Sequence, residues 1–197
     1  MTTLLLDGGP VAPDAPVSRT GGVPLGPAGM VWPVCGACAG PLQFLAQLVL
    51  DAGVLALFMC AHRPGGCAQW SPSAGGNLAL LLPADGLVPV PVPHGADPEV
   101  LGLGAVRAAV PSAAGAATGA ATGAASEGRA VLGSLGGEPD WLQYDETPDC
   151  PACARPMGFA AGLREGPDPV TAMNFGSGRA YAHVCGGCGR AALLWQC

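Results

Sequence analysis

The sequence predicts a mainly β protein, with α+β as the alternative, built from two pseudo-symmetric four-cysteine units of strand–knuckle–strand form. Residues 21–48 recur at residues 136–163 without a gap, and twelve of the 28 positions are identical. Each copy contains a CxxC motif and is followed by a second pair of cysteines. The 32 Gly and 21 Pro among 197 residues favour turns over long helices.

The first half of the chain is predicted to hold a tail and one unit. Residues 1–20 are rich in proline and lack periodicity, so we expect a mobile tail. Residues 21–104 form the first unit, with apolar strands over residues 42–50 and 54–60 that meet at a turn. A further strand is expected within residues 75–82, after a GGN turn.

The second half is predicted to be a linker followed by the other unit. Residues 105–135 include a low-complexity Ala/Gly/Thr tract, in which each Gly would cost a helix about 1 kcal/mol, so we expect a flexible linker. Residues 136–197 form the second unit, with strands over residues 157–163 and 180–185. The two units could pack as one domain, because each alone has few apolar strands to bury.

The cysteine spacing predicts two metal sites. A CxxC turn points two sulfurs the same way, and two such pairs brought together by a hairpin give a tetrahedral four-thiolate zinc site. The second unit supplies Cys150, Cys153, Cys185 and Cys188. The first supplies Cys35, Cys38, Cys60 and Cys67. We therefore expect about two zinc ions per chain.

The first site departs from the usual spacing, because six residues separate Cys60 from Cys67. His62 lies in that interval and could replace one of the cysteines, and an unmetallated site is a further alternative.

The expected compartment is the cytoplasm, because the N-terminus lacks the basic and apolar regions of a signal peptide. Thiols stay reduced there, which favours zinc over disulfides. The apolar stretch over residues 42–59 contains Asp51, so we interpret it as strands rather than as a membrane span.

The charge indicates the kind of partner. The net charge is −6 and the chain has no Lys, which opposes nucleic-acid binding and favours a basic protein segment. An acidic loop precedes the second CxxC, and it is either a solvated loop or a docking surface for such a segment. Its carboxylates are Asp140, Asp145, Glu146 and Asp149.

The sites predict a protein that is not an enzyme. Four thiolates leave no open position for a catalytic water on the metal. A thioredoxin-type CxxC begins a helix, whereas here each CxxC precedes a proline and an expected strand, which argues against redox catalysis. A thiol oxidoreductase is kept as one alternative. A nucleic-acid-binding zinc ribbon is another.

The motifs GGxPxWxQ, PxCPxCxxPMxF and YxxxCxxC, with a closing WQ, are similar to the bacterial YwqG-like family of unknown function. The first copy, with CGACAGPLQFLAQL and FMCAHRPGGCAQW, resembles the eukaryotic programmed-cell-death-protein-two family. Together these resemblances imply a β-rich, metal-stapled fold. The eukaryotic family implies a cytosolic chaperone that holds a small-subunit ribosomal protein. Only the cysteines carry over to this chain.

Overall fold

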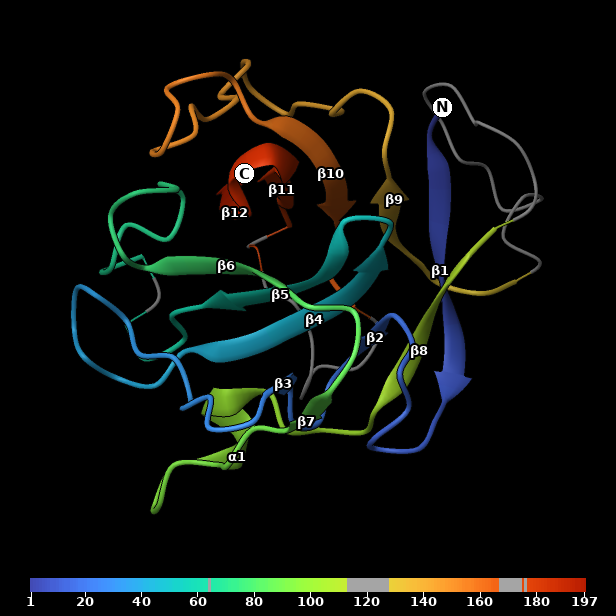
Figure 1. Cartoon of the computed structure of the whole chain (residues 1–197), viewed down its shortest axis with the longest axis vertical. Coiled ribbons are helices and arrows are strands. Elements are labelled where there is room, and N and C mark those ends of the chain that lie inside the picture. Colours follow the sequence, from blue (N-terminus) through green and yellow to red (C-terminus); the bar gives the residue numbers. More distant parts are fainter. Residues whose placement is uncertain (64, 113–127, 167–174, 176) are drawn as a thin grey trace.

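The protein folds around one curved ten-stranded sheet with the order β12-β11-β10-β9-β1-β8-β2-β4-β5-β6 (Figure 1). The computed structural model describes residues 1–63, 65–112, 128–166, 175 and 177–197. The strands of the sheet are β1 (Thr3–Pro10), β2 (Arg19–Thr20), β4 (Gln43–Leu50), β5 (Gly53–Met59), β6 (Asn77–Leu82), β8 (Arg107–Pro111), β9 (Val131–Leu135), β10 (Gly158–Leu163), β11 (Arg179–Cys185) and β12 (Arg190–Gln196). Neighbouring strands are antiparallel throughout.

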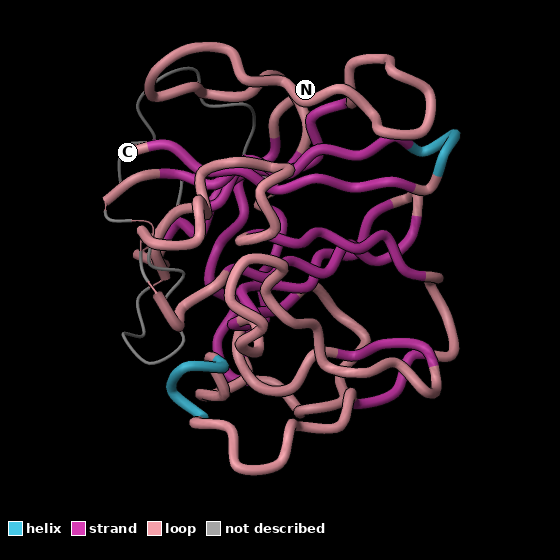
Figure 2. Tube along the Cα trace, turned by 90° about the vertical axis from the view of Figure 1, so that its left-hand side faces the viewer, coloured by secondary structure: helices cyan, strands magenta, loops and turns pink. Residues whose placement is uncertain are grey.

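The remaining elements are short. Strands β3 (Leu25–Pro27) and β7 (Leu87–Pro89) form a separate two-stranded sheet. The helices in the described part of the chain are α1 (Pro98–Leu101) and the single 3-10 turn η1 (Gly186–Cys188), which lie at opposite ends of the molecule (Figure 2). Neither is long and apolar enough to span a membrane. The prediction of a mainly β fold with two similar four-cysteine groups is confirmed.

The apolar stretch around Asp51 forms the hairpin β4–β5, as predicted. Every residue of β5 is buried, and so are the first six of β4. Strands covered on both faces have near-continuous apolar sequences, which is why this stretch has the composition of a membrane span. The turn at 51–52 and the positive φ of 128° at Gly53 reverse the chain.

The strands that precede each unit are exchanged at the centre of the sheet. β1 precedes the first unit, and it pairs with β9, which pairs in turn with β10 of the second unit. β8 precedes the second unit, and it pairs with β2, which pairs in turn with β4 of the first. β1 and β8 pair with each other, so the pseudo-twofold axis of the repeat lies between them. Each unit therefore needs the strand that precedes the other.

The prediction of a mobile tail over residues 1–20 is wrong, because residues 3–10 form β1 and residues 19–20 form β2. Leu5 and Leu6 are 1% exposed within the sheet. The partners of β1 are β8 and β9, which lie about a hundred residues further along the chain, so no local pattern marks it as a strand. Strands β8 and β9 likewise occupy both ends of the expected 105–135 linker, and residues 113–127 lie outside the described part of the chain.

One hydrophobic core is shared by the two units. Leu48 and Leu57 of the first unit belong to the same buried cluster as Leu163 and Leu193 of the second. The end strands β6 and β12 also meet, since the Asn77 side-chain amide donates to the Leu193 carbonyl at 3.2 Å. A second cluster covers the other face of β4 and β5 beneath α1. The sheet thus wraps around a core to which both units contribute.

Candidate metal centres

The eight cysteines of the repeat lie in two groups of four. The groups are Cys35, Cys38, Cys60 and Cys67, and Cys150, Cys153, Cys185 and Cys188. In each group all sulfurs lie within 4.8 Å of one another. Two cross-pair distances are 3.7 Å, from Cys38 to Cys60, and 3.9 Å, from Cys153 to Cys185. Four sulfurs each about 2.3 Å from a tetrahedral zinc would be about 3.8 Å apart. Both groups could therefore hold a metal ion.

The two CxxC knuckles have the same backbone hydrogen bonds. The first cysteine of each donates its N–H to the carbonyl five residues later, from Cys35 to Gly40 and from Cys150 to Arg155, both at 2.8 Å. The residue after the second cysteine donates to the carbonyl of the first, again at 2.8 Å in both copies. The repeat in the sequence is thus a repeat in backbone structure.

The closing pairs differ, as the sequence predicts. Cys185 ends β11, and η1 carries the chain directly to Cys188. In the first unit the longer loop after Cys60 is held by Gln69, whose amide donates to the carbonyls of Cys60 at 3.0 Å and of Arg63 at 2.8 Å. His62 lies outside the four-sulfur group, with its ring so close to Gly40 that a side chain at Gly40 would collide with it.

A residue with positive φ follows the second cysteine of every pair. The φ angles are 60° at Ala39, 48° at Ala68, 52° at Ala154 and 60° at Gly189. A left-handed conformation strains any residue that has a Cβ atom. Three of the four knuckles therefore store strain in an alanine.

Replacing Ala154 with glycine is expected to stabilise the protein by about 0.5–1 kcal/mol. The relieved left-handed strain, about 1–2 kcal/mol, exceeds the entropy that glycine loses on folding. Chemical denaturation of the metal-loaded protein measures this change. Ala152 lies in the same knuckle without a positive φ, so Ala152→Gly is the matched control and should destabilise by about 0.5–1 kcal/mol. Equal effects at the two positions would contradict the strain argument.

Each group favours one thiolate before metal binds. The Arg155 side chain and backbone lower the pKa of Cys153 to about 6, and the Gly40 N–H lowers the pKa of Cys38 to about 7. The pKa of Cys188 is raised to about 12 by its hydrogen bonds to Cys153 and Cys185, and burial raises the pKa of Cys67 to about 12. A metal ion must therefore displace protons from the remaining thiols, which makes its binding dependent on pH.

Arg155 is a site residue that sequence reasoning missed. Its guanidinium hydrogen-bonds to Cys153, and the nearby thiolates raise its pKa. The repeat contained a signal, because the equivalent residue of the first knuckle is Gly40. A positive side chain is thus present beside only the second of these two knuckles.

The acidic loop makes contacts within the chain. The Asp140 carboxylate forms an ion pair with Arg179, and Asp145 accepts the N–H of Thr147 at 2.8 Å. Glu146 accepts a hydrogen bond from the Gln196 amide at 2.8 Å. The contacts of Asp140 and Glu146 hold the loop against β11 and β12, and the contact of Asp145 lies within the loop. A role of this loop in docking a partner stays a prediction.

The comparisons with known proteins give no function. No protein-family model matches the chain. A stretch of 66 residues, 34% of the chain, is 34% identical to a Salmonella typhimurium protein described as "Uncharacterized protein YpfL". That stretch covers 15% of the Salmonella protein, so the chain spans far less than two thirds of this relative. The resemblances to the YwqG-like and programmed-cell-death-protein-two families stay predictions.

Proposed function

We propose that this chain is a cytoplasmic, non-catalytic, zinc-stapled protein that binds a basic segment of another protein, in the manner of a chaperone for a ribosomal protein. The grouping of all eight repeat cysteines supports a structural role for the metal, because four thiolates fill a tetrahedral zinc site. A metal without an open position holds the fold and does not activate water.

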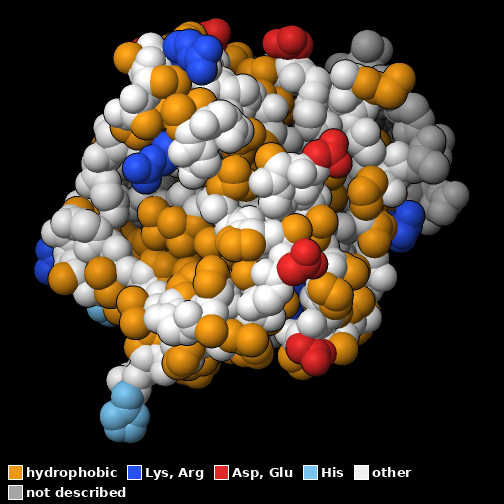
Figure 3. Space-filling view, in the orientation of Figure 1, with side chains coloured by type: hydrophobic (Ala, Val, Ile, Leu, Met, Phe, Trp, Pro, Cys, Tyr) orange, Lys and Arg blue, Asp and Glu red, His pale blue; other side chains and the backbone are white. Residues whose placement is uncertain are grey.

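The observation that carries the proposal is an apolar cavity of about 190 Å³ beside two carboxylates in the first unit. Its lining includes Val17, Leu25, Val49, Val54 and Leu87, with Asp14 and Asp85. Both aspartates are exposed, and in the described part of the chain neither carboxylate has a hydrogen bond or an ion pair, although Asp14 interacts electrostatically with the buried Arg19. The face drawn in Figure 3 has hydrophobic side chains with acidic ones among them.

This lining suits a Lys or Arg side chain. The aliphatic stem of such a side chain can pack on valine and leucine while its charged end meets a carboxylate. The net charge of −6 would draw a basic segment toward the whole molecule. Asp14 and Asp85 are free of the intramolecular bonds that engage most of the acidic loop, so we place the main contact here and keep Asp140, Asp145, Glu146 and Asp149 as a second candidate surface.

The test is binding of the metal-loaded protein to a peptide of alternating Arg and Leu, measured by fluorescence anisotropy. We expect binding that weakens as salt is added, since charge supplies part of the affinity. The double variant Asp14→Asn/Asp85→Asn should weaken binding about tenfold, the order expected for two charge-assisted contacts. The control Glu99→Gln/Glu138→Gln removes the same charge from exposed residues outside the cavity and should bind as the unmodified protein does.

Three outcomes would contradict the proposal. Equal binding of a peptide with Glu in place of Arg would show that charge is not recognised. Tighter binding of single-stranded RNA than of the peptide would favour the zinc-ribbon alternative. Turnover of a disulfide substrate by the metal-loaded protein would favour the oxidoreductase.

A further inference from the structure

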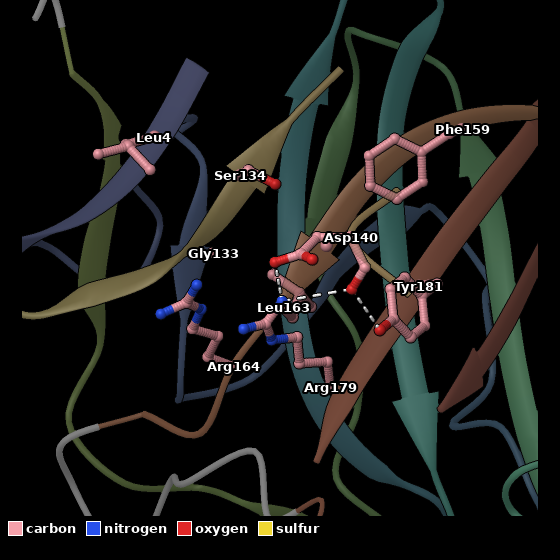
Figure 4. Close-up of a pocket in the computed structure, with 10 residues that line it drawn as sticks. Leu4, Gly133, Ser134, Asp140, Phe159, Leu163, Arg164, Arg179 and Tyr181 are labelled. Carbon is pink, nitrogen blue, oxygen red and sulfur yellow. Dashed lines mark hydrogen bonds and ion pairs between the residues drawn. The ribbon is translucent and has the colours of Figure 1, made fainter. Parts of the chain in front are cut away.

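A second cavity lies in the second unit, at the position that the repeat assigns to the first (Figure 4). Its volume is about 50 Å³, and its lining includes Ser134, Asp140, Gly162, Arg164 and Arg179. The repeat, with its offset of 115 positions, aligns Leu25, Gln47 and Val49 of the first cavity with Asp140, Gly162 and Arg164 of the second. The two cavities are therefore the same place in two copies of one unit.

Strand register supports this equivalence. In the first unit Phe44 pairs with Phe58, and Gln47 pairs with Ala56. In the second unit Phe159 pairs with His183, and Gly162 pairs with Tyr181. Both hairpins have an irregularity just after the phenylalanine. This register also matches Val54 of the first cavity with Arg179 of the second.

Two large side chains fill the space beside the first cavity, and two small ones replace them in the second. Arg19 is fully buried and donates to the carbonyls of Pro13 and Val23. Its cross-strand partner Gln47 bonds both the N–H and the carbonyl of Leu25, at 3.0 and 2.8 Å.

The equivalent pair in the second unit is Ser134 opposite Gly162. A Cβ atom at Gly162 would meet its nearest neighbours at 3.5 Å or more, which is ordinary contact. The second unit thus has two small residues where the first unit has Arg19 and Gln47.

The charge of the second cavity is opposite to that of the first. Arg179 bonds the carboxylate and the carbonyl of Asp140, and Arg164 projects toward the same opening (Figure 4). In the described residues no hydrogen bond or ion pair engages the Arg164 guanidinium. Partial burial, and then the charge of Arg179, lower the pKa of Arg164. Two guanidiniums face one carboxylate, so the lining has a net positive charge.

We propose that this cavity binds the carboxylate group of a small organic acid, between Arg164 and Arg179. A space of this size holds only a few waters, so it admits a head group and leaves the rest of the ligand outside. Guanidinium groups pair with carboxylates through two parallel hydrogen bonds. The existing ion pair between Arg179 and Asp140 shows that this opening accommodates a carboxylate. The Ser134 hydroxyl lines the same space.

Acetate is the probe, titrated into the metal-loaded full chain and followed by the backbone amide resonances of Ser134 and Gly162. We expect saturable shifts with a dissociation constant on the order of 1 mM, and none with chloride at equal ionic strength. Arg164→Gln should weaken binding about tenfold or more, because it removes a charged donor. Arg129→Gln removes the same charge from an exposed residue outside the lining and should leave binding unchanged.

A second variant fills the cavity without removing charge. Gly162→Gln introduces the residue that the first unit has at the equivalent position. It should abolish the acetate-induced shift of the Ser134 amide resonance and leave the melting temperature unchanged. Absence of saturable shifts in the unmodified protein would overturn the proposal, and so would unchanged affinity in Arg164→Gln. Tighter binding of inorganic phosphate than of acetate would overturn the assignment to carboxylates. Binding of an acidic peptide but not of acetate would overturn the assignment to a small acid.

Discussion

Replacing Cys153 with serine is expected to lower the metal content from about two ions per chain to about one and to destabilise the protein by several kcal/mol. Cys153 belongs to the second four-sulfur group, and three remaining thiolates cannot close a tetrahedral site. Because metal binding in such sites supplies folding free energy, its loss removes much of the stability of the second hairpin. Elemental analysis and thermal unfolding of the same preparation measure both effects.

The controls separate metal loss from the loss of any thiol. Cys197 is exposed and lies outside both groups, so Cys197→Ser should keep both ions and the melting temperature. Cys38→Ser should remove the ion of the first group alone. Chelation of the unmodified protein should unfold it, and added zinc should refold it. Protein purified without zinc, with its cysteines in disulfides, would contradict the metal assignment.

Cutting the chain within residues 113–127 is expected to leave the two pieces bound to each other. After a cut there, β9 would still pair with β1, and the shared cluster would still join Leu48 and Leu57 to Leu163 and Leu193. A protease site inserted in this tract makes the cut, and size-exclusion chromatography follows the product. We expect one peak of unchanged volume, which separates into two only in denaturant.

The separated pieces should not remain folded. The piece that begins at residue 128 would lack β1, leaving β9 with an unpaired edge and half of the shared core exposed to water. Its circular dichroism after dilution from denaturant should show no cooperative unfolding. Two pieces that separate without denaturant, each with its own cooperative transition, would show that the units are independent domains.

The sequence predicted the features that local residues decide. The β4–β5 hairpin follows from two apolar runs around Asp51, and the knuckles follow from CxxC spacing. β1 was missed because its three leucines at 4–6 find their partners only in β8 and β9. Arg19 was missed for a related reason. Its partners are backbone carbonyls, and no sequence pattern marks which carbonyls a fold will leave unpaired.

The repeat contained more information about the sites than the cysteines alone. Aligning Gln47 with Gly162 and Val49 with Arg164 shows a change of size and charge at matched positions. Only the strand register shows that these positions line a cavity, and only the fold brings Asp14 and Asp85 beside the first one. Positions at which the two copies differ in size and charge therefore indicate where each copy has a function of its own.

The exchanged strands also fix the order in which the protein can fold during synthesis. β1 leaves the ribosome before the other described strands, but β8 and β9 follow only after about a hundred further residues. Each metal-binding hairpin, by contrast, is complete within a few tens of residues and can close around its ion as soon as it emerges. The leucines of β1 therefore stay exposed to water while the chain lengthens and while the first metal ion is bound. The centre of the sheet therefore forms after the first metal-binding hairpin, although it contains β1, the first strand of the described chain.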